Sequence, residues 1–249
     1  MWLTATLIVY GIADRVSAAT NRHPLANPVL HSIWMLGLLL WATGTPYRAY
    51  FEGAQFVHFM LGPAIVALAI PLWETRRQIA RVFLPMIAAL VAGAIVALTS
   101  AVAIAMAFGA PRDVLIAIAP KSVTAGVAMG VAETLGGDPA LAAVLVILTG
   151  VVGAIAVTPL MNGLGLRDWR ARGFAAGLAS HGIGAARAFQ VHPTAGAFAG
   201  VAMGLNALFT ALIAPLVFDW AWEHPLLVLA SALLLPQPGW AWRCQCQRA

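Results

Sequence analysis

Long apolar segments separated by short polar connections occupy most of the chain. Many of them approach or exceed the roughly 20 residues that an α-helix needs to cross a bilayer. They are continuous aliphatic runs, without the strict alternation that is typical of membrane β-strands. We therefore predict an all-α polytopic membrane protein. The predicted segments are residues 3–18, 28–43, 56–73, 82–108, 114–131, 140–164, 174–189, 195–218 and 225–235.

The composition agrees with this pattern. Of the 249 residues, 61% are hydrophobic and only 9% are charged, and the mean hydropathy is +0.88. Residues 1–4 carry no basic group before the first apolar run, so we expect a first transmembrane helix and no cleaved signal peptide. The two cysteines, Cys244 and Cys246, are too few for a closed metal site. We expect no metal and no cofactor.

The formal net charge of +5 comes largely from arginines that lie between the apolar segments. Short arginine-rich loops stay in the cytoplasm, so these residues indicate topology and not a nucleic-acid partner. Two clusters stand out, one at Arg76, Arg77 and Arg81, the other at Arg167, Arg170 and Arg172. On the opposite side we expect an aromatic interfacial loop at residues 47–52.

Placing both arginine clusters inside creates a conflict in the number of crossings. Segment 82–108 would leave the cytoplasmic side and segment 140–164 would return to it. Residues 114–137 must then begin and end outside, which favours a re-entrant hairpin with residues 120–124 dipping inward. The alternative is that residues 114–131 span the membrane fully and that one cluster violates a statistical rule.

The sequence also contains an approximate internal repeat. Gly62-Pro63 recurs as Ala119-Pro120 after 57 positions, and residues 92–95 resemble residues 149–152 at the same offset. A weaker echo relates residues 158–160 to 214–216. Repeated units with interrupted helices indicate a mid-membrane binding site, to which we assign Gly62 and Pro63. The alternative is chance similarity among segments rich in alanine, valine and glycine.

Lys121 is the only lysine in the chain, and it lies in an apolar segment between Pro120 and Ser122, with Thr124 close by. A charge at membrane depth is costly and marks a functional site by default. Proline suits the first turn of a helix, and a helix N-terminus attracts anions. These four residues predict a site for a small anion. The alternative is a lysine that extends from a helix end to the interface.

A second polar stretch contains Ser180, His181, Gly182, Gly184 and Arg187. Glycines weaken a helix and allow close backbone approach, so we expect a break at Gly182–Gly184 that brings His181 and Arg187 together. His181 can donate, accept or titrate near neutral pH, which makes it the candidate for proton coupling. We predict that these five residues line the same site as Lys121. The alternatives are a histidine bonded to a backbone carbonyl and an arginine at the interface.

The remaining polar and small residues have structural explanations. Asn206 lies among apolar residues and is assigned to hydrogen bonding between helices. Asn27 and Pro28 predict a helix start. Glycines spaced four apart predict close helix packing, at Gly173, Gly177, Gly196 and Gly200. No paired carboxylates, nucleophile–base pair or phosphate-binding loop appears, so we expect neither an enzyme nor ATP-driven transport.

Together these motifs resemble the LrgB/CidB family, which includes the plastidic glycolate/glycerate translocators. The resemblance covers about residues 27–216. It implies a membrane protein that moves small monocarboxylates such as glycolate, glycerate or pyruvate. It also implies an older assignment, a holin-like modulator of murein hydrolase export and autolysis that acts with a small LrgA/CidA-type membrane partner. The tail after Phe218 departs from the family pattern. The motifs are Asn27-Pro28, Tyr50-Phe51-Glu52-Gly53-Ala54, Leu61-Gly62-Pro63-Ala64, Val66-Ala67-Leu68-Ala69, Pro120-Lys121-Ser122-Val123-Thr124, Ile147-Leu148-Thr149-Gly150 and Ala179-Ser180-His181-Gly182-Ile183-Gly184.

We therefore expect a proton-coupled secondary transporter of small monocarboxylates, multi-pass in the bacterial inner membrane, with the holin-like regulator as the alternative. Its partners are expected to be the carboxylate substrate, the lipid bilayer, an LrgA/CidA-type protein and a second copy of the chain in a homodimer. Broken or re-entrant helices of the repeated units would form the site. The expected parts are residues 1–54 (N-terminal helices and interfacial loop), 55–110 (first repeat unit), 111–218 (second unit and core) and 219–249 (divergent helix and tail).

Overall fold

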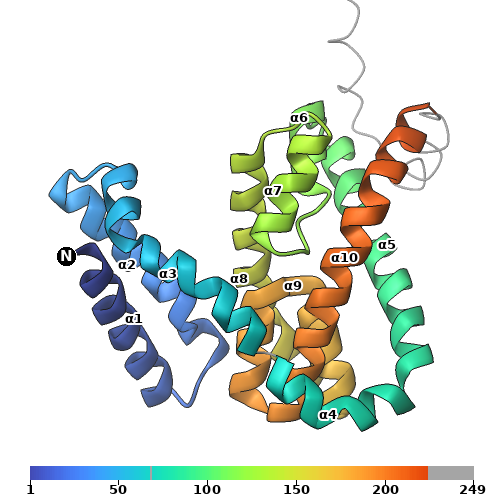
Figure 1. Ribbon diagram of the computed structural model, residues 1–249, viewed down its shortest axis with the longest axis horizontal. Helices are drawn as coiled ribbons and strands as arrows, with labels where there is room; N and C mark the ends of the chain where they lie inside the picture. Colours follow the sequence, from blue (N-terminus) through green and yellow to red (C-terminus); the bar gives the residue numbers. More distant parts are fainter. Residues whose placement is uncertain (68, 224–249) are drawn as a thin grey trace, which may run out of the picture. The chain divides into compact units, whose positions relative to one another are not determined.

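The computed structural model describes residues 1–67 and 69–223, which form helices joined by short turns (Figure 1). No β-strand occurs among these residues, and the all-α prediction is confirmed for them. Segment 225–235, Cys244 and Cys246 lie outside the described residues. The elements are α1 (Trp2–Ala19), η1 (Pro24–Ala26), α2 (Pro28–Thr43), α3 (Tyr47–Ala67), α4 (Ala69–Arg81), α5 (Phe83–Ala107), α6 (Arg112–Ile118), α7 (Ala125–Thr134), α8 (Pro139–Gly163), α9 (Trp169–Val191) and α10 (Pro193–Glu223).

Four predicted segments match helices closely. Segments 3–18, 28–43, 82–108 and 140–164 agree with α1, α2, α5 and α8 to within one residue at each end. Within the described residues, three helical stretches are long and apolar enough to cross a membrane, namely α5, α8 and residues 193–214 of α10. These stretches support a membrane protein with more than one crossing.

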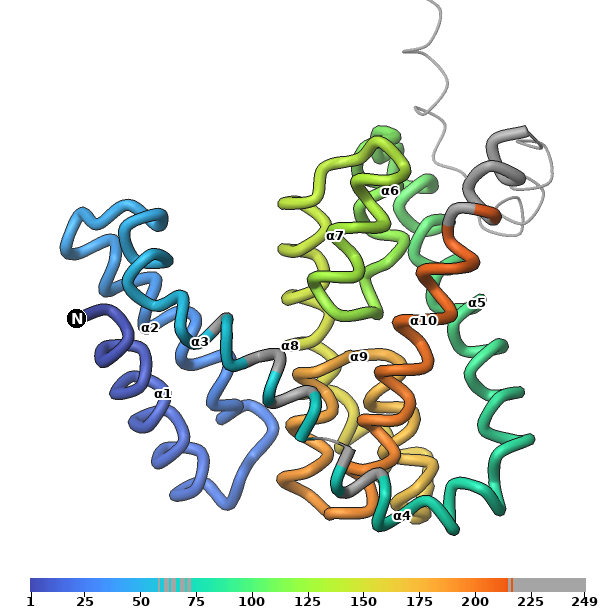
Figure 2. The backbone as a smooth tube through the Cα atoms, in the orientation of Figure 1, coloured from blue at the N-terminus to red at the C-terminus, as the bar shows by residue number. Residues whose placement is uncertain are grey.

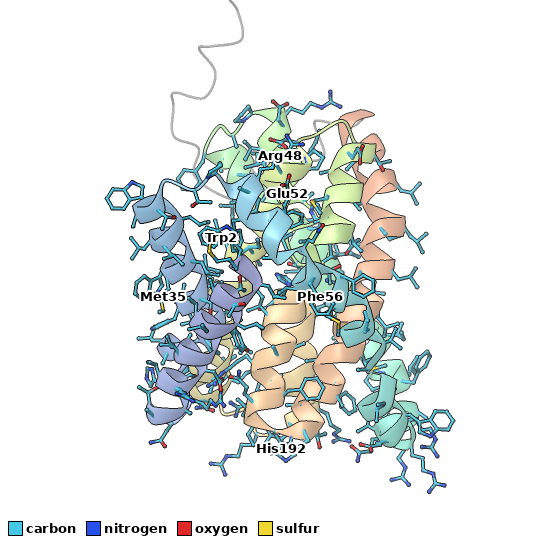
Figure 3. The ribbon with its side chains drawn as sticks, turned by 60° about the vertical axis from the view of Figure 1, so that its left-hand side comes forward. Trp2, Met35, Arg48, Glu52, Phe56 and His192 are labelled. Atoms are coloured by element: carbon cyan, nitrogen blue, oxygen red, sulfur yellow. The ribbon has the colours of Figure 1, made fainter. Side chains whose placement is uncertain are left out.

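The third predicted segment, residues 56–73, does not coincide with a helix: it covers the end of α3 and the start of α4. The expected interfacial loop at 47–52 is helical, because α3 already begins at Tyr47. Arg48 and Glu52 lie one turn apart on this helix, where their charged groups approach to 3.9 Å (Figure 3). The expected break at Pro63 is not found either, since α3 continues through this proline to Ala67.

The described residues group into two compact units, of which the first comprises residues 1–81, 151–177 and 183–201. In it, α1 packs against α2 and α3, and the Trp2 and Tyr50 rings meet edge to face at 5.9 Å. As predicted, Asn27 starts α2: its side-chain oxygen accepts hydrogen bonds from two backbone N–H groups of the first turn, at 2.9 and 3.2 Å.

The second unit comprises residues 82–150, 178–182 and the described residues from 202 onward. In it, the chain runs up α5, reverses through the short helices α6 and α7, and enters α8 (Figure 2). Buried alanines permit close packing around Ile116 on α6, which contacts Gly137 so closely that an added Cβ would lie 2.5 Å from its methyl carbon. A second buried cluster joins Val123, Ala128 and Val146.

Candidate functional site

The segment around Lys121 is a turn between two short helices. α6 has 7 residues and α7 has 10, so neither reaches the length of a membrane span, and residues 114–131 do not form one continuous helix. Pro120 lacks the N–H group that would extend α6, which ends at Ile118. The prediction that Pro120 opens a helix is therefore wrong: α7 begins only at Ala125, with Thr124 as its N-cap residue.

Lys121 lies at the tip of this hairpin of helices. Backbone hydrogen bonds from Lys121 to the Ile118 carbonyl and from Val123 to the Pro120 carbonyl, both 3.1 Å, hold the turn. The Lys121 amine is half-buried and lies 3.4 Å from the Ser122 hydroxyl, and Ser122 itself is buried. Among the described side chains, no carboxylate forms an ion pair with Lys121. A cation that is partly withdrawn from water favours an anionic ligand.

The chain of α9 folds back on itself. Its first residue, Trp169, stacks on His192, which follows its last residue, with ring centroids 4.9 Å apart. A straight helix would separate these two positions by about 35 Å. The reversal occurs at Ser180 and His181, whose backbone angles are non-helical. The break therefore lies just before Gly182, and not between Gly182 and Gly184 as the glycines suggested.

His181 occupies a backbone conformation that non-glycine residues rarely adopt, with φ +41° and ψ −136°. Its side chain is buried, and Nε2 lies 2.9 Å from the Val146 carbonyl of α8. A carbonyl can only accept, so Nε2 carries the proton in the neutral ring and Nδ1 is left as an acceptor. The expected alternative for His181, a bond to a backbone carbonyl, is what the structure shows, and this bond also orients the ring.

Asn206 of α10 connects the two polar turns. Its Nδ2 group donates to the Ser122 carbonyl at 3.2 Å and to the Leu178 carbonyl at 3.1 Å, and its Oδ1 accepts from the Thr210 hydroxyl at 3.4 Å. Both carbonyls belong to chain reversals, where helical partners are lost. The expected helix-to-helix role of Asn206 understated its importance: this single amide joins the turn that holds Lys121 to the turn that holds His181.

The predicted site residues thus fall into separate groups. Lys121, Ser122 and Thr124 share one turn, and Ser180, His181 and Gly182 share the other. A Cβ added at Gly182 would lie 3.7 Å from the Met203 sulfur. Asn206 brings the two turns together through their backbones, while Lys121 and His181 make separate contacts, to Ser122 and to Val146. Pro63 lies inside α3, so no break there adds to the site.

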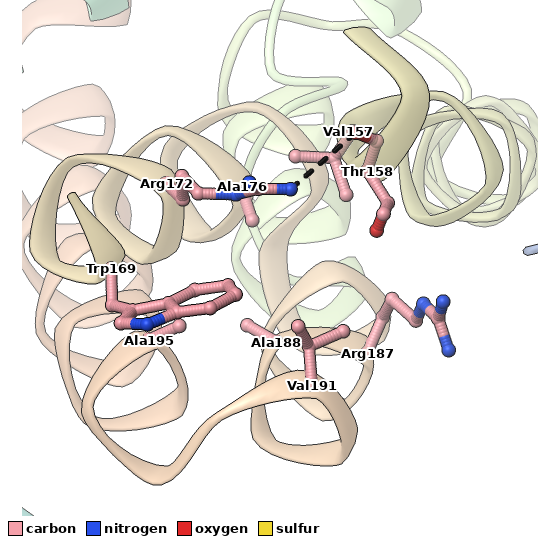
Figure 4. Close-up of a pocket in the computed structure, with 9 residues that line it drawn as sticks. All are labelled: Val157, Thr158, Trp169, Arg172, Ala176, Arg187, Ala188, Val191 and Ala195. Atoms are coloured by element: carbon pink, nitrogen blue, oxygen red, sulfur yellow. Dashed lines mark hydrogen bonds between the residues drawn. The ribbon is translucent and has the colours of Figure 1, made fainter. Parts of the chain in front are cut away.

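Arg187 lines a different pocket, in the first unit. It is buried, its Nη1 lies 3.5 Å from the Gln190 side-chain oxygen, and its Nε has no hydrogen-bond partner among the residues that the structure describes. In Figure 4 the guanidinium of Arg172 points toward Thr158, whereas that of Arg187 extends away from the other lining residues. The cavity measures about 20 Å³, room for one water and not for a carboxylate. A role for Arg187 and Gly184 at the Lys121 site stays a prediction.

A wider pocket of about 490 Å³ in the first unit, the arginine pocket, brings Arg81 of the first arginine cluster near Arg167 and Arg170 of the second. It is lined by Gln78 and Arg81 from the end of α4, by residues 167–170 before and at the start of α9, and by Thr194 of α10. Asp168 caps α9 and pairs with Arg170, and the hydrogen bond from this guanidinium lowers the pKa of Asp168. One arginine of the pocket is thereby neutralised, and Arg81 and Arg167 are not.

Comparison with known proteins assigns the family. The chain is 26% identical to the holin-like protein CidB of Staphylococcus epidermidis, over 87% of this chain and 94% of that protein. It is 32% identical to an uncharacterized protein of Haemophilus influenzae, over 77% and 83%, and 32% identical to the uncharacterized protein YxaC of Bacillus subtilis, over 78% and 84%. No solved structure matches it. The model of the LrgB-like family matches residues 6–220, and the chain belongs to this family.

Proposed function

We propose that this protein is a secondary transporter of small monocarboxylates, such as glycolate, glycerate or pyruvate, and that Lys121 binds the carboxylate. The observation that carries the proposal is the hydrogen bonding of Asn206 to both polar turns, one of which holds a half-buried lysine that has no acidic partner among the described residues. Non-helical backbone at membrane depth is tolerated where protein covers it or where it lines a water-filled cavity. Two such turns joined at one point suit a binding site between them.

The arginine pocket supports a re-entrant path for the Lys121 hairpin. Arg81 precedes α5 and Arg167 follows α8, and both line the same pocket, so the chain between them leaves one membrane face and returns to it. α5 and α8 account for the two crossings. The pair α6–α7 then begins and ends on the far side, with Lys121 directed toward the membrane interior.

Helix positions support a repeat of similar length. Its two copies begin at other helices than Gly62-Pro63 and Ala119-Pro120 suggested. α5 begins at residue 83 and α8 at residue 139, which is 56 positions later; the α6–α7 pair spans 112–134 and α9 spans 169–191, each bound 57 positions later. Each copy of this repeat is a 25-residue helix followed by a hairpin. Because α5 and α8 would cross the membrane in opposite directions, the two copies would be inverted, as in many secondary transporters.

His181 is the residue we propose for proton coupling. Its neutral ring keeps Nδ1 free to accept a proton while Nε2 remains bonded to Val146. We further propose that the protein lies in the bacterial inner membrane as a homodimer, and that it has no enzymatic activity. The bacterial relatives support this location.

The second candidate is a holin-like regulator of murein hydrolase export, supported by the name of the CidB relatives; it would act with an LrgA/CidA-type partner. Purified protein in liposomes distinguishes the two. A transporter gives saturable uptake of labelled glycolate or glycerate, stimulated by a proton gradient, while an encapsulated dye is retained. Release of the dye without saturable uptake would support the holin-like function and contradict ours.

A further inference from the structure

The arginine pocket carries more positive charge than the described carboxylates balance. It is lined by Arg81, Arg167 and Arg170, and among the described residues only Arg170 has a carboxylate partner, Asp168. Gln78 and Thr194 add uncharged hydrogen-bonding groups. Arginine forks match the geometry of phosphate oxygens, so the chemistry of this pocket selects a phosphate group.

Helix α4, which supplies Arg81, has the character of a helix that lies in the membrane interface. Its described apolar side chains Ile70 and Trp73 are 65% and 68% exposed, and three arginines follow them within the same helix. The Arg76 guanidinium lies 4.2 Å from the centroid of the Trp73 ring. A short helix with exposed aromatic and aliphatic groups and several arginines binds at the boundary between headgroups and acyl chains.

We infer that this pocket binds the headgroup of an anionic phospholipid on the cytoplasmic face. The arginine-rich connections place the pocket on that face, where anionic lipids concentrate. A volume of about 490 Å³ accommodates a phosphodiester headgroup. Exposed apolar groups on the same helix would contact the acyl chains, which a free phosphate ion lacks, and this favours a lipid over phosphate from solution.

Lipid binding to the purified full chain in neutral detergent tests the inference, with phosphatidylglycerol, phosphatidylcholine and inorganic phosphate as separate probes in native mass spectrometry. The wild type should bind phosphatidylglycerol at least tenfold more tightly than the other two. The variant Arg81→Gln/Arg167→Gln should bind it about 25-fold more weakly, since each arginine near an anionic surface contributes about fivefold. Phosphate binding as tight as that of phosphatidylglycerol would overturn the lipid assignment.

The matched control is Arg48→Gln/Arg77→Gln, which removes two positive charges from α3 and α4 without touching the pocket. This variant should keep its affinity for phosphatidylglycerol within about twofold. An equal loss in both variants would show diffuse attraction by net charge and would overturn a defined site. If the glutamine variant does not fold, Arg81→Lys/Arg167→Lys replaces it: this pair keeps the charge but loses the planar fork, and should still weaken binding severalfold. Unchanged binding would contradict the pocket.

Discussion

At the scale of single residues, Asn206 holds together two segments that are distant in the sequence. Its amide satisfies carbonyls 84 and 28 positions away. Asn206→Leu should lower the free energy of unfolding by about 1–3 kcal/mol, because one buried and one partly buried carbonyl lose their donor. Asn206→Asp should be worse, since a carboxylate cannot donate to either carbonyl. Thermal unfolding in detergent measures both, with Thr210→Val, which removes one 3.4 Å bond, as the control. Wild-type stability of Asn206→Leu would contradict this role.

The backbone of His181 allows a second test at this scale. At φ +41° a glycine is unstrained and an alanine is not, so His181→Gly should be more stable than His181→Ala by about 1 kcal/mol. In a regular helix the order would be reversed, because alanine is the better helix former. Comparing melting temperatures of the two variants decides between these conformations, and a more stable alanine variant would argue against the chain reversal at this residue.

A third residue-scale prediction concerns proton coupling. Gln can donate to the Val146 carbonyl as His181 does, but it does not titrate near neutral pH. His181→Gln should therefore retain carboxylate binding and flatten the pH dependence of uptake over the range from mildly acidic to neutral pH. Uptake measured over this range in liposomes provides the test, and an unchanged pH profile would assign the coupled proton to another group.

At the scale of elements, the part of α9 before Ser180 packs against α10, and glycines allow the two backbones to approach closely. An added Cβ at Gly173 or Gly177 would overlap the carbonyl of Ala195 or Ala199, whereas at Gly200 it would meet nothing within 4 Å. Gly173→Ala and Gly177→Ala should each cost about 2 kcal/mol or more, and Gly200→Ala should be neutral or slightly stabilising. Equal melting temperatures for Gly177→Ala and Gly200→Ala would contradict this packing.

The sequence predicted most elements and the hairpin around Lys121, but it placed the break in α9 at Gly182–Gly184 and did not predict that the helix folds back there. Continuous apolar runs define α5 and α8 well, because aliphatic residues in a bilayer have few alternatives to a helix. The hairpin around Lys121 followed from a charge-placement argument. The fold-back of α9 did not, since its signal is the positive φ of His181 and a stacking of Trp169 on His192 across 23 positions. Long-range hydrogen bonds such as those of Asn206 leave no spacing pattern in one sequence.

At the scale of the whole molecule, the chain combines long apolar crossings with short polar reversals that meet at Asn206. In the proposed transport function, Lys121, the one lysine of this chain, binds the carboxylate substrate. Removing a cation that pairs with a partly desolvated carboxylate should cost about 2–5 kcal/mol of binding, or a factor of about 30 to several thousand in affinity.

Uptake of labelled glycolate or glycerate by liposomes containing Lys121→Ala is the decisive test of whether Lys121 binds the transported carboxylate. This variant should fold, with a melting temperature close to that of the wild type, because Lys121 contributes no ion pair among the described residues. Saturable uptake should be abolished, and Lys121→Arg need not restore it because the guanidinium is larger and planar. Wild-type uptake by a folded Lys121→Ala protein would contradict this role of Lys121.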